Sequence, residues 1–151
     1  MRIYLDNCCY NRPFDNQDDL RIRLETVAKL AVQLMMATGV VEYVWSDILT
    51  HEVLQNPIRR RRRLIFSWRN GAVEDVVSDE NVLRRGKSFQ SLGIKPKDAL
   101  HLASAVESGC DWFLTTDKGI LKKVSVAEGV KIANPVDFIM TEGYHAERTD
   151  M

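Results

Sequence analysis

Short apolar runs bounded by polar or turn-forming residues recur along the chain and predict buried β-strands. The first run is Ile3-Tyr4-Leu5, which stops at Asp6-Asn7. The second, at residues 40–45, is rich in the β-branched and aromatic side chains that favour strands. Further strands are predicted at residues 72–77, 111–115 and 130–132.

Between these strands, apolar residues recur every three or four positions, which is typical of helices. Residues 17–37 predict an amphipathic helix that Gly39 ends, and Ser46 is a favourable N-cap for a helix at residues 46–56. Residues 7–16 are predicted to form a loop or a single turn. The apolar positions of the amphipathic helix are Leu20, Leu24, Val27, Ala31, Leu34 and Met35. Further helices are predicted at residues 58–68, 79–92 and 95–108 and in a short segment that ends at Met140.

Strands that alternate with helices predict an α/β fold, with a parallel sheet covered by helices on both faces. With 151 residues, the chain has the length of one domain. We expect that domain to occupy residues 1–140, followed by a polar, frayed tail at residues 141–151. In such sheets, functional sites form at the carboxyl ends of the strands, so the residues after each strand are of most interest.

Four acidic residues lie where they are expected to converge. Asp6 ends the first strand, Asp117 follows the strand at residues 111–115, and Asp98 and Glu52 lie near the starts of two helices. Carboxylates brought together repel one another unless a cation is present, and hard oxygen ligands suit Mg²⁺ or Mn²⁺. Alternatively, each acid is satisfied locally, as a turn or helix cap, with Glu52 paired to an arginine. Placement alone leaves both interpretations open.

Composition narrows the classes of function. The chain has 21 basic and 21 acidic residues, which argues against a uniformly basic nucleic-acid binder or a polybasic membrane binder. Without the four acids, however, 21 basic residues face 17 acidic ones, so the body outside the predicted site is moderately basic. Three cysteines without framework spacing and no signal-like N-terminus predict a cytoplasmic protein without disulfides, and no segment is apolar and long enough to span a membrane.

The residues resemble the PIN-domain family, whose pattern is a strand followed by Asp, a mid-chain Glu, a helix that starts Asp-Ala, and Thr-x-Asp after the next strand. The matching segments are Ile3-Tyr4-Leu5-Asp6-Asn7, Glu52, Asp98-Ala99-Leu100-His101-Leu102-Ala103-Ser104-Ala105 and Leu114-Thr115-Thr116-Asp117. The resemblance covers residues 2–140. It implies a three-layer α/β/α sandwich and a metal-dependent ribonuclease for single-stranded RNA, including the VapC-type toxins.

The resemblance also assigns roles to individual residues. Asp6, Asp98 and Asp117 would hold one or two Mg²⁺ or Mn²⁺ ions, and Glu52 would complete the catalytic pocket and orient a metal-bound water. Asn7 and Thr115 would support these carboxylates. The chain departs from the family at Asn7, where Ser or Thr is commoner, and after Asp117, where no second acid follows. A noncatalytic PIN-like module that binds RNA or protein is therefore the alternative.

The partners implied by the resemblance are an RNA substrate, a separate antitoxin protein and a second copy of the chain. Five consecutive arginines, Arg59, Arg60, Arg61, Arg62 and Arg63, are candidates for contact with RNA phosphates, although a solvated helix would explain them equally well. Arg12 is a candidate for the same role or for an ion pair with Asp15 that orders its loop. His101 and the pair Cys8-Cys9 are interpreted as packing residues.

Overall fold

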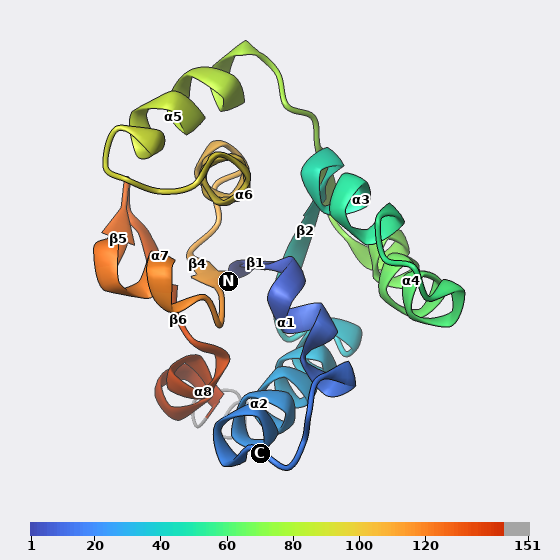
Figure 1. Cartoon of the computed structure of the whole chain (residues 1–151). Coiled ribbons are helices and arrows are strands. Elements are labelled where there is room, and N and C mark those ends of the chain that lie inside the picture. The colour runs from blue at the N-terminus through green and yellow to red at the C-terminus, as the bar shows by residue number, and fades with distance from the viewer. Residues whose placement is uncertain (144–151) are drawn as a thin grey trace.

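A central sheet organises the computed structural model, which describes residues 1–143 (Figure 1). The strand order is β3-β2-β1-β4-β6-β5. Five strands are parallel, and the short β5 pairs antiparallel with β6 at one edge. The strands are β1 (Arg2–Leu5), β2 (Glu42–Ser46), β3 (Glu74–Val76), β4 (Trp112–Leu114), β5 (Val126–Ala127) and β6 (Val130–Ala133).

The central position of β1 follows from its composition. Ile3, Tyr4 and Leu5 have no exposed surface, because both faces of the strand are covered. Parallel strands buried on both faces are continuously apolar rather than alternating, and this run of three has that pattern. β1 pairs with β2 on one side and with β4 on the other. The order of the strands along the chain therefore reverses at β1.

Helices cover both faces of the sheet, which confirms the predicted α/β/α sandwich. Helices α2 and α8 pack together on one side, and α5 and α6 pack together on the other (Figure 1). None of the helices in residues 1–143 combines the length and the apolar character that crossing a bilayer requires. The helices are α1 (Asn7–Asn11), α2 (Leu20–Ala37), α3 (Asp47–Leu54), α4 (Arg59–Phe66), α5 (Glu80–Gln90), α6 (Pro96–Glu107), α7 (Lys118–Lys123) and α8 (Pro135–Phe138), with shorter turns η1 (Arg12–Phe14), η2 (Ser67–Gly71) and η3 (Ile139–Gly143).

Local structure is richer than the sequence predicts in two places. The expected loop at residues 7–16 contains α1 and η1, and α7 begins at Lys118, shortly after the end of β4 at Leu114. Asp6 and Asp117 cap α1 and α7 by accepting hydrogen bonds from backbone N–H groups, which explains where these helices begin. At the other end, η3 extends past residue 140 to Gly143. The rest of the predicted tail lies outside the described residues.

Helix α2 buries an unexpected face. An apolar stripe on a surface helix ordinarily faces the core, yet here Glu25, Lys29 and Gln33 are buried while Leu20 and Leu34 are exposed. Glu25 forms ion pairs with Arg12 and Arg21 and accepts a hydrogen bond from Asn134. These contacts tie α2 to η1 and to the end of β6. The polar side chains share the buried face of α2 with the core residues Val32 and Met36.

Candidate metal centre at the sheet edge

The carboxyl ends of β1 and β4 place two of the predicted acids side by side. Leu5 is in register with Leu114, and the N–H of Asp6 donates to the carbonyl of Leu114 over 2.9 Å. Asp6 therefore lies opposite Thr115, and Asp117 follows two residues later. Strand order reverses between these two strands, and crevices at such switch points are the usual sites of open α/β sheets.

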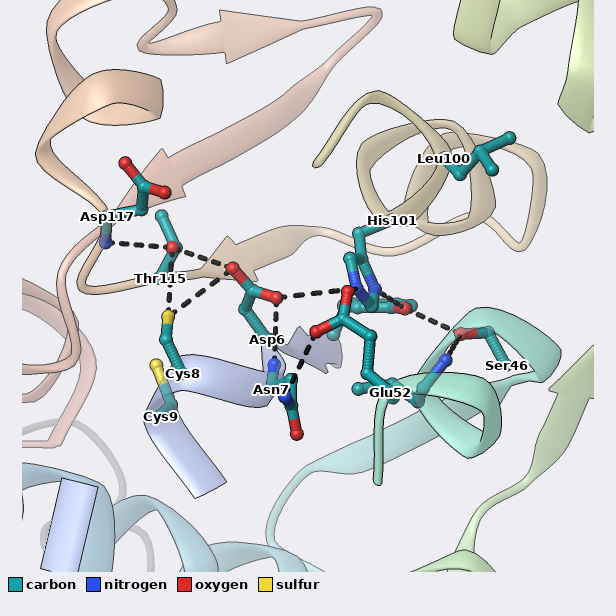
Figure 2. Close-up of polar contacts among 12 residues, drawn as sticks. Asp6, Asn7, Cys8, Cys9, Ser46, Glu52, Leu100, His101, Thr115 and Asp117 are labelled. Carbon is teal, nitrogen blue, oxygen red and sulfur yellow. Dashed lines mark hydrogen bonds and ion pairs between the residues drawn. The ribbon is translucent and has the colours of Figure 1, made fainter. Parts of the chain in front are cut away.

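Thr115 links Asp6 to Asp117 (Figure 2). Its hydroxyl donates to Oδ2 of Asp6 over 2.9 Å and accepts a hydrogen bond from the N–H of Asp117 over 3.1 Å. The thiol of Cys8 donates to the same Oδ2 over 3.4 Å. Asp6 is only 4% exposed, so these donors compensate part of its lost hydration and fix the direction of its carboxylate.

Glu52 reaches the site from α3, one turn after the end of β2. Its Oε1 lies 2.6 Å from Nε2 of His101 on α6, and its Oε2 accepts a hydrogen bond from Nδ2 of Asn7 over 3.0 Å. The same nitrogen of His101 lies 3.8 Å from Oδ1 of Asp6. His101 thus lies between two of the predicted catalytic carboxylates, as Figure 2 shows.

A buried chain of hydrogen bonds continues behind His101. Its Nδ1 lies 2.5 Å from the hydroxyl of Tyr4, which lies 2.6 Å from the hydroxyl of Ser46. A carboxylate only accepts hydrogen bonds, so Nε2 carries a proton toward Glu52. Neutral His101 then accepts at Nδ1 from Tyr4, and protonated His101 donates there instead. The chain is satisfied in both protonation states.

Charge and burial act in opposite directions on this pair. Burial alone would raise the pKa of Glu52, but the hydrogen bond and charge of His101 lower it below its usual value. For His101, burial favours the neutral ring, yet the charge of Asp6 and the hydrogen bond and charge of Glu52 raise its pKa. The two groups therefore hold each other in their charged forms.

Asp98 has the opposite environment. It lies in the first turn of α6, half-buried, and lines a small cavity of about 50 Å³ together with Asp117, Lys95 and Lys123. Burial and the charges of Asp6 and Asp117 raise its pKa to about 6. Ionised Asp98 is thus destabilised by the neighbouring acids, which is the electrostatic situation that a bound cation relieves.

The chemistry of the donors fits a hard divalent cation. Asp6, Asp98 and Asp117 offer carboxylate oxygens, which Mg²⁺ and Mn²⁺ prefer. Burial, together with repulsion from Asp6 and Asp117, raises the pKa of Asp98. In the part of the chain that the structure describes, no three His, Cys, Asp or Glu side chains are already gathered closely enough to hold an ion. Asp98 and Asp117 line the same small cavity, and Thr115 links Asp117 to Asp6, but the three carboxylates are not drawn together into a coordination shell.

Comparisons with known proteins identify the family of the chain and its fold. The family model of the PIN domain matches residues 3–126. The chain belongs to the PIN-domain family. Among solved structures, a chain from the crystal structure of VapBC2 from Rickettsia felis, bound to a DNA fragment from their promoter, resembles this PIN domain with a TM-score of 0.54 and 13% identity, covering 89% of this chain and 98% of that one. Among curated proteins, no match was found.

The arginine run of this PIN domain divides into two groups. Arg61 lies over the ring of Phe14, 5.0 Å from its centre, and Arg62 donates to the carbonyl of Asn56 over 2.6 Å. The other three, Arg59, Arg60 and Arg63, are exposed and line a surface hollow of about 630 Å³ with Leu64 and Ser67.

Arg12 lies in an ion-paired cluster. Its guanidinium contacts Asp15 over 2.9 Å and buried Glu25 over 2.9 Å. The sequence leaves open whether Arg12 contacts RNA or forms an ion pair with Asp15 that orders the loop. The structure contains this ion pair.

Sequence reasoning missed His101 and Cys8 as site residues. His101 has no exposed surface and joins Glu52 to Tyr4. Its position three residues after Asp98 places it almost one helical turn further along the same face, which was the available signal. Cys8 donates to Asp6 from α1, and only the helical turn that begins at Asp6 brings its thiol back toward that carboxylate.

We expect Asp98→Asn to stabilise the metal-free protein above about pH 6. An acid with a raised pKa in the folded state destabilises the fold when it ionises, so the gain is absent at pH 4 and present at pH 8. Because Asp98 is only half-buried, the expected gain is about 1–2 kcal/mol. Thermal melting in a chelator at both pH values measures it, and an equal effect at pH 4 and pH 8 would contradict the electrostatic explanation.

We expect His101→Ala to lower the free energy of unfolding by about 2–4 kcal/mol. The substitution leaves a buried cavity and removes the hydrogen-bond partner of both Tyr4 and Glu52. His51→Ala is the matched control, because His51 is exposed on α3, and its effect should stay within about 0.5 kcal/mol. Urea denaturation compares the two variants; similar losses would show that His101 has no special structural role.

Proposed function

We propose that this PIN domain is a metal-dependent endoribonuclease that cleaves single-stranded RNA. The observation that carries the proposal is the raised pKa of Asp98, which burial and the nearby charges of Asp6, Asp117 and Glu52 produce at the carboxyl edge of the paired strands β1 and β4. Membership of a family whose members are generally nucleases supports it.

Within this proposal, Asp6, Asp98 and Asp117 hold one or two Mg²⁺ or Mn²⁺ ions. Such ions lower the pKa of a bound water and stabilise the charge that develops on a leaving oxygen. Glu52, kept ionised by His101 and Asn7, orients the attacking water through its carboxylate. Thr115 and Cys8 keep the Asp6 carboxylate directed into the crevice. The products would carry a 5′-phosphate and a 3′-hydroxyl.

The RNA backbone would lie across α4. Arg59, Arg60 and Arg63 are exposed and line one hollow, so they are available to phosphates. Arg61 and Arg62 already have partners within the protein and position the helix instead. Asn56, next to the start of α4, donates to Asn11, and Asn11 donates to Asn7 beside Glu52, which connects the arginine surface to the acidic site.

We also propose that the protein is the toxin of a toxin–antitoxin pair that acts in the cytoplasm. The support is the likeness of its fold to a chain of a VapBC complex, and its three cysteines are all unpaired, which suits a reducing compartment. The antitoxin would be a small separate protein that inhibits the nuclease.

We expect Asp6→Asn and Asp98→Asn each to abolish RNA cleavage in Mn²⁺ while the fold remains intact. Each change removes one carboxylate from the group that holds the metal. Asp18→Asn, at an exposed position outside the site, should retain wild-type cleavage. The assay follows a labelled single-stranded RNA, with circular dichroism to monitor folding.

Two outcomes would contradict the proposed activity. If both site variants still cleaved RNA, the assignment of these acids as metal ligands would be wrong. If the folded, partner-free wild type cleaves no RNA in Mn²⁺, the noncatalytic binding module becomes the correct description.

We expect the triple variant Arg59→Gln, Arg60→Gln, Arg63→Gln to bind single-stranded RNA more weakly and with a flatter salt dependence. Three lost phosphate contacts reduce the slope of log K against log salt concentration by about 2. The control triple Arg84→Gln, Lys87→Gln, Lys122→Gln removes the same charge from exposed positions elsewhere. Binding is measured with Asp98→Asn as background so that RNA stays intact. Equal salt-dependence slopes for the two triple variants would show that the arginine run is a solvated surface with no specific role in RNA binding.

A further inference from the structure

Five aliphatic side chains lie exposed along the outer face of α2, and we call them the α2 stripe. Such a continuous apolar surface is unusual on a protein that acts alone. The opposite side of the helix, which carries Val32 and Met36 as well as Glu25, is buried, so the stripe results from the orientation of α2 and not from an unfolded or frayed end. Its members and their exposed fractions are Leu20 (62%), Leu24 (52%), Val27 (67%), Leu30 (52%) and Leu34 (66%).

The α2 stripe is symmetric about Val27. Leu20 and Leu34 lie seven positions to either side, and Leu24 and Leu30 lie three positions to either side. At about 100° per residue, all five side chains fall within about 60° of the direction of Val27. A two-fold axis through Val27 would therefore place apolar residues opposite apolar residues along the whole stripe.

The charges around the α2 stripe favour an uncharged partner surface. Between Thr26 and Val41 the only charged residue is Lys29, which is 5% exposed and points into the protein. Exposed charges lie toward the N-terminal end of the stripe, at Asp18, Asp19 and Arg23, and the same two-fold axis would set Arg23 against the small Ala31 of the second copy. Its aliphatic stem can cover that alanine while the guanidinium reaches solvent.

We propose that the α2 stripe is the contact surface between two copies of this chain, with the two α2 helices antiparallel about Val27. The family resemblance implies a homodimer without assigning it a face. This assignment follows from the symmetry and exposure of the stripe, and it does not depend on the proposed nuclease activity. An interface of this kind is self-complementary, as a two-fold contact requires.

Electrostatics favour an antiparallel over a parallel arrangement of the two α2 helices. In a parallel pair, Arg21 of one copy would face Arg21 of the other, and Arg23 would face Arg23, so that like charges would meet across the contact. In the antiparallel pair the two Arg23 residues are about 12 Å apart along the axis at 1.5 Å per residue, beyond the screening length of roughly 8 Å in physiological salt. The antiparallel arrangement also sets the positive end of each helix dipole beside the negative end of the other.

The size of the stripe fits a dimer contact. Five aliphatic side chains that are half to two-thirds exposed contribute on the order of 500 Å² per copy, the larger part of the roughly 800 Å² per partner in a standard interface. The flanking residues Ala37, Thr38 and Val40 are exposed as well and extend the uncharged surface.

The first experiment compares two valine substitutions by sedimentation equilibrium of the full chain over a range of concentrations. Val27→Glu should raise the dimer dissociation constant at least about 30-fold, because two carboxylates would meet at the axis and a central contact of this kind typically carries a large share of the affinity. Val77→Glu is the matched control, since Val77 is 69% exposed in the segment between β3 and α5. A wild type that stays monomeric at every concentration, or equal weakening by both variants, would overturn the proposal.

The second experiment tests orientation without depending on a destabilised dimer. Leu20→Cys and Leu34→Cys chains of different tag length are mixed and treated with a short bifunctional maleimide. The antiparallel pair predicts crosslinks between the two different variants, and none between two copies of Leu20→Cys, whose positions are about 21 Å apart along the axis. Crosslinks chiefly between identical variants would show a parallel pair and overturn the proposed geometry, and no crosslinks above the wild-type background would overturn the interface.

Discussion

Parallel pairing of β1 with both β2 and β4 is the constraint on which the rest of the structure depends. Because all three strands run in one direction, the segments that follow them emerge at one edge of the sheet. Asp6 and Thr115 become neighbours there, and α3 brings Glu52 to the same edge after β2. α6, which leads back into β4, carries Asp98 and His101 toward them. One apolar run of three residues at the centre of the sheet thus positions side chains from four distant parts of the chain.

Buried carboxylates impose the second level of organisation. Glu25 is 1% exposed and is neutralised by Arg12 and Arg21, and Glu52 is held by His101 and Asn7. In both cases, hydrogen-bond donors replace part of the hydration that burial removes. Asp98 differs, since burial and the charges of Asp6 and Asp117 raise its pKa to about 6. The contrast separates carboxylates that stabilise the fold from one whose environment is suited to a bound cation.

The elements of secondary structure could be read from the sequence because their signals are local. Each signal depends only on nearby residues. Examples are the apolar run at residues 3–5, the β-branched segment near residues 40–45 and the cap residue Ser46. Helices α1 and α7 were not predicted, because each is short and is capped by an aspartate that also belongs to the candidate metal site. In the sequence, an aspartate that caps a helix cannot be told from one that binds a metal. Only the positions of the neighbouring strands distinguish these two roles.

The sequence by itself determined the α/β class, the apolar centre of the sheet and the four acids that lie where strands end and helices begin. These features depend on period and on residue type, which are properties of a chain segment. The tertiary structure alone decided that His101 joins Glu52 to Tyr4, that only three of the five consecutive arginines are free to meet a partner, and that the leucines of α2 lie exposed. Each of these outcomes depends on what a side chain meets from elsewhere in the chain. Periodicity shows that a helix has apolar positions, but only the packed structure shows that Val32 and Met36 of α2 face the core beside the ion-paired Glu25.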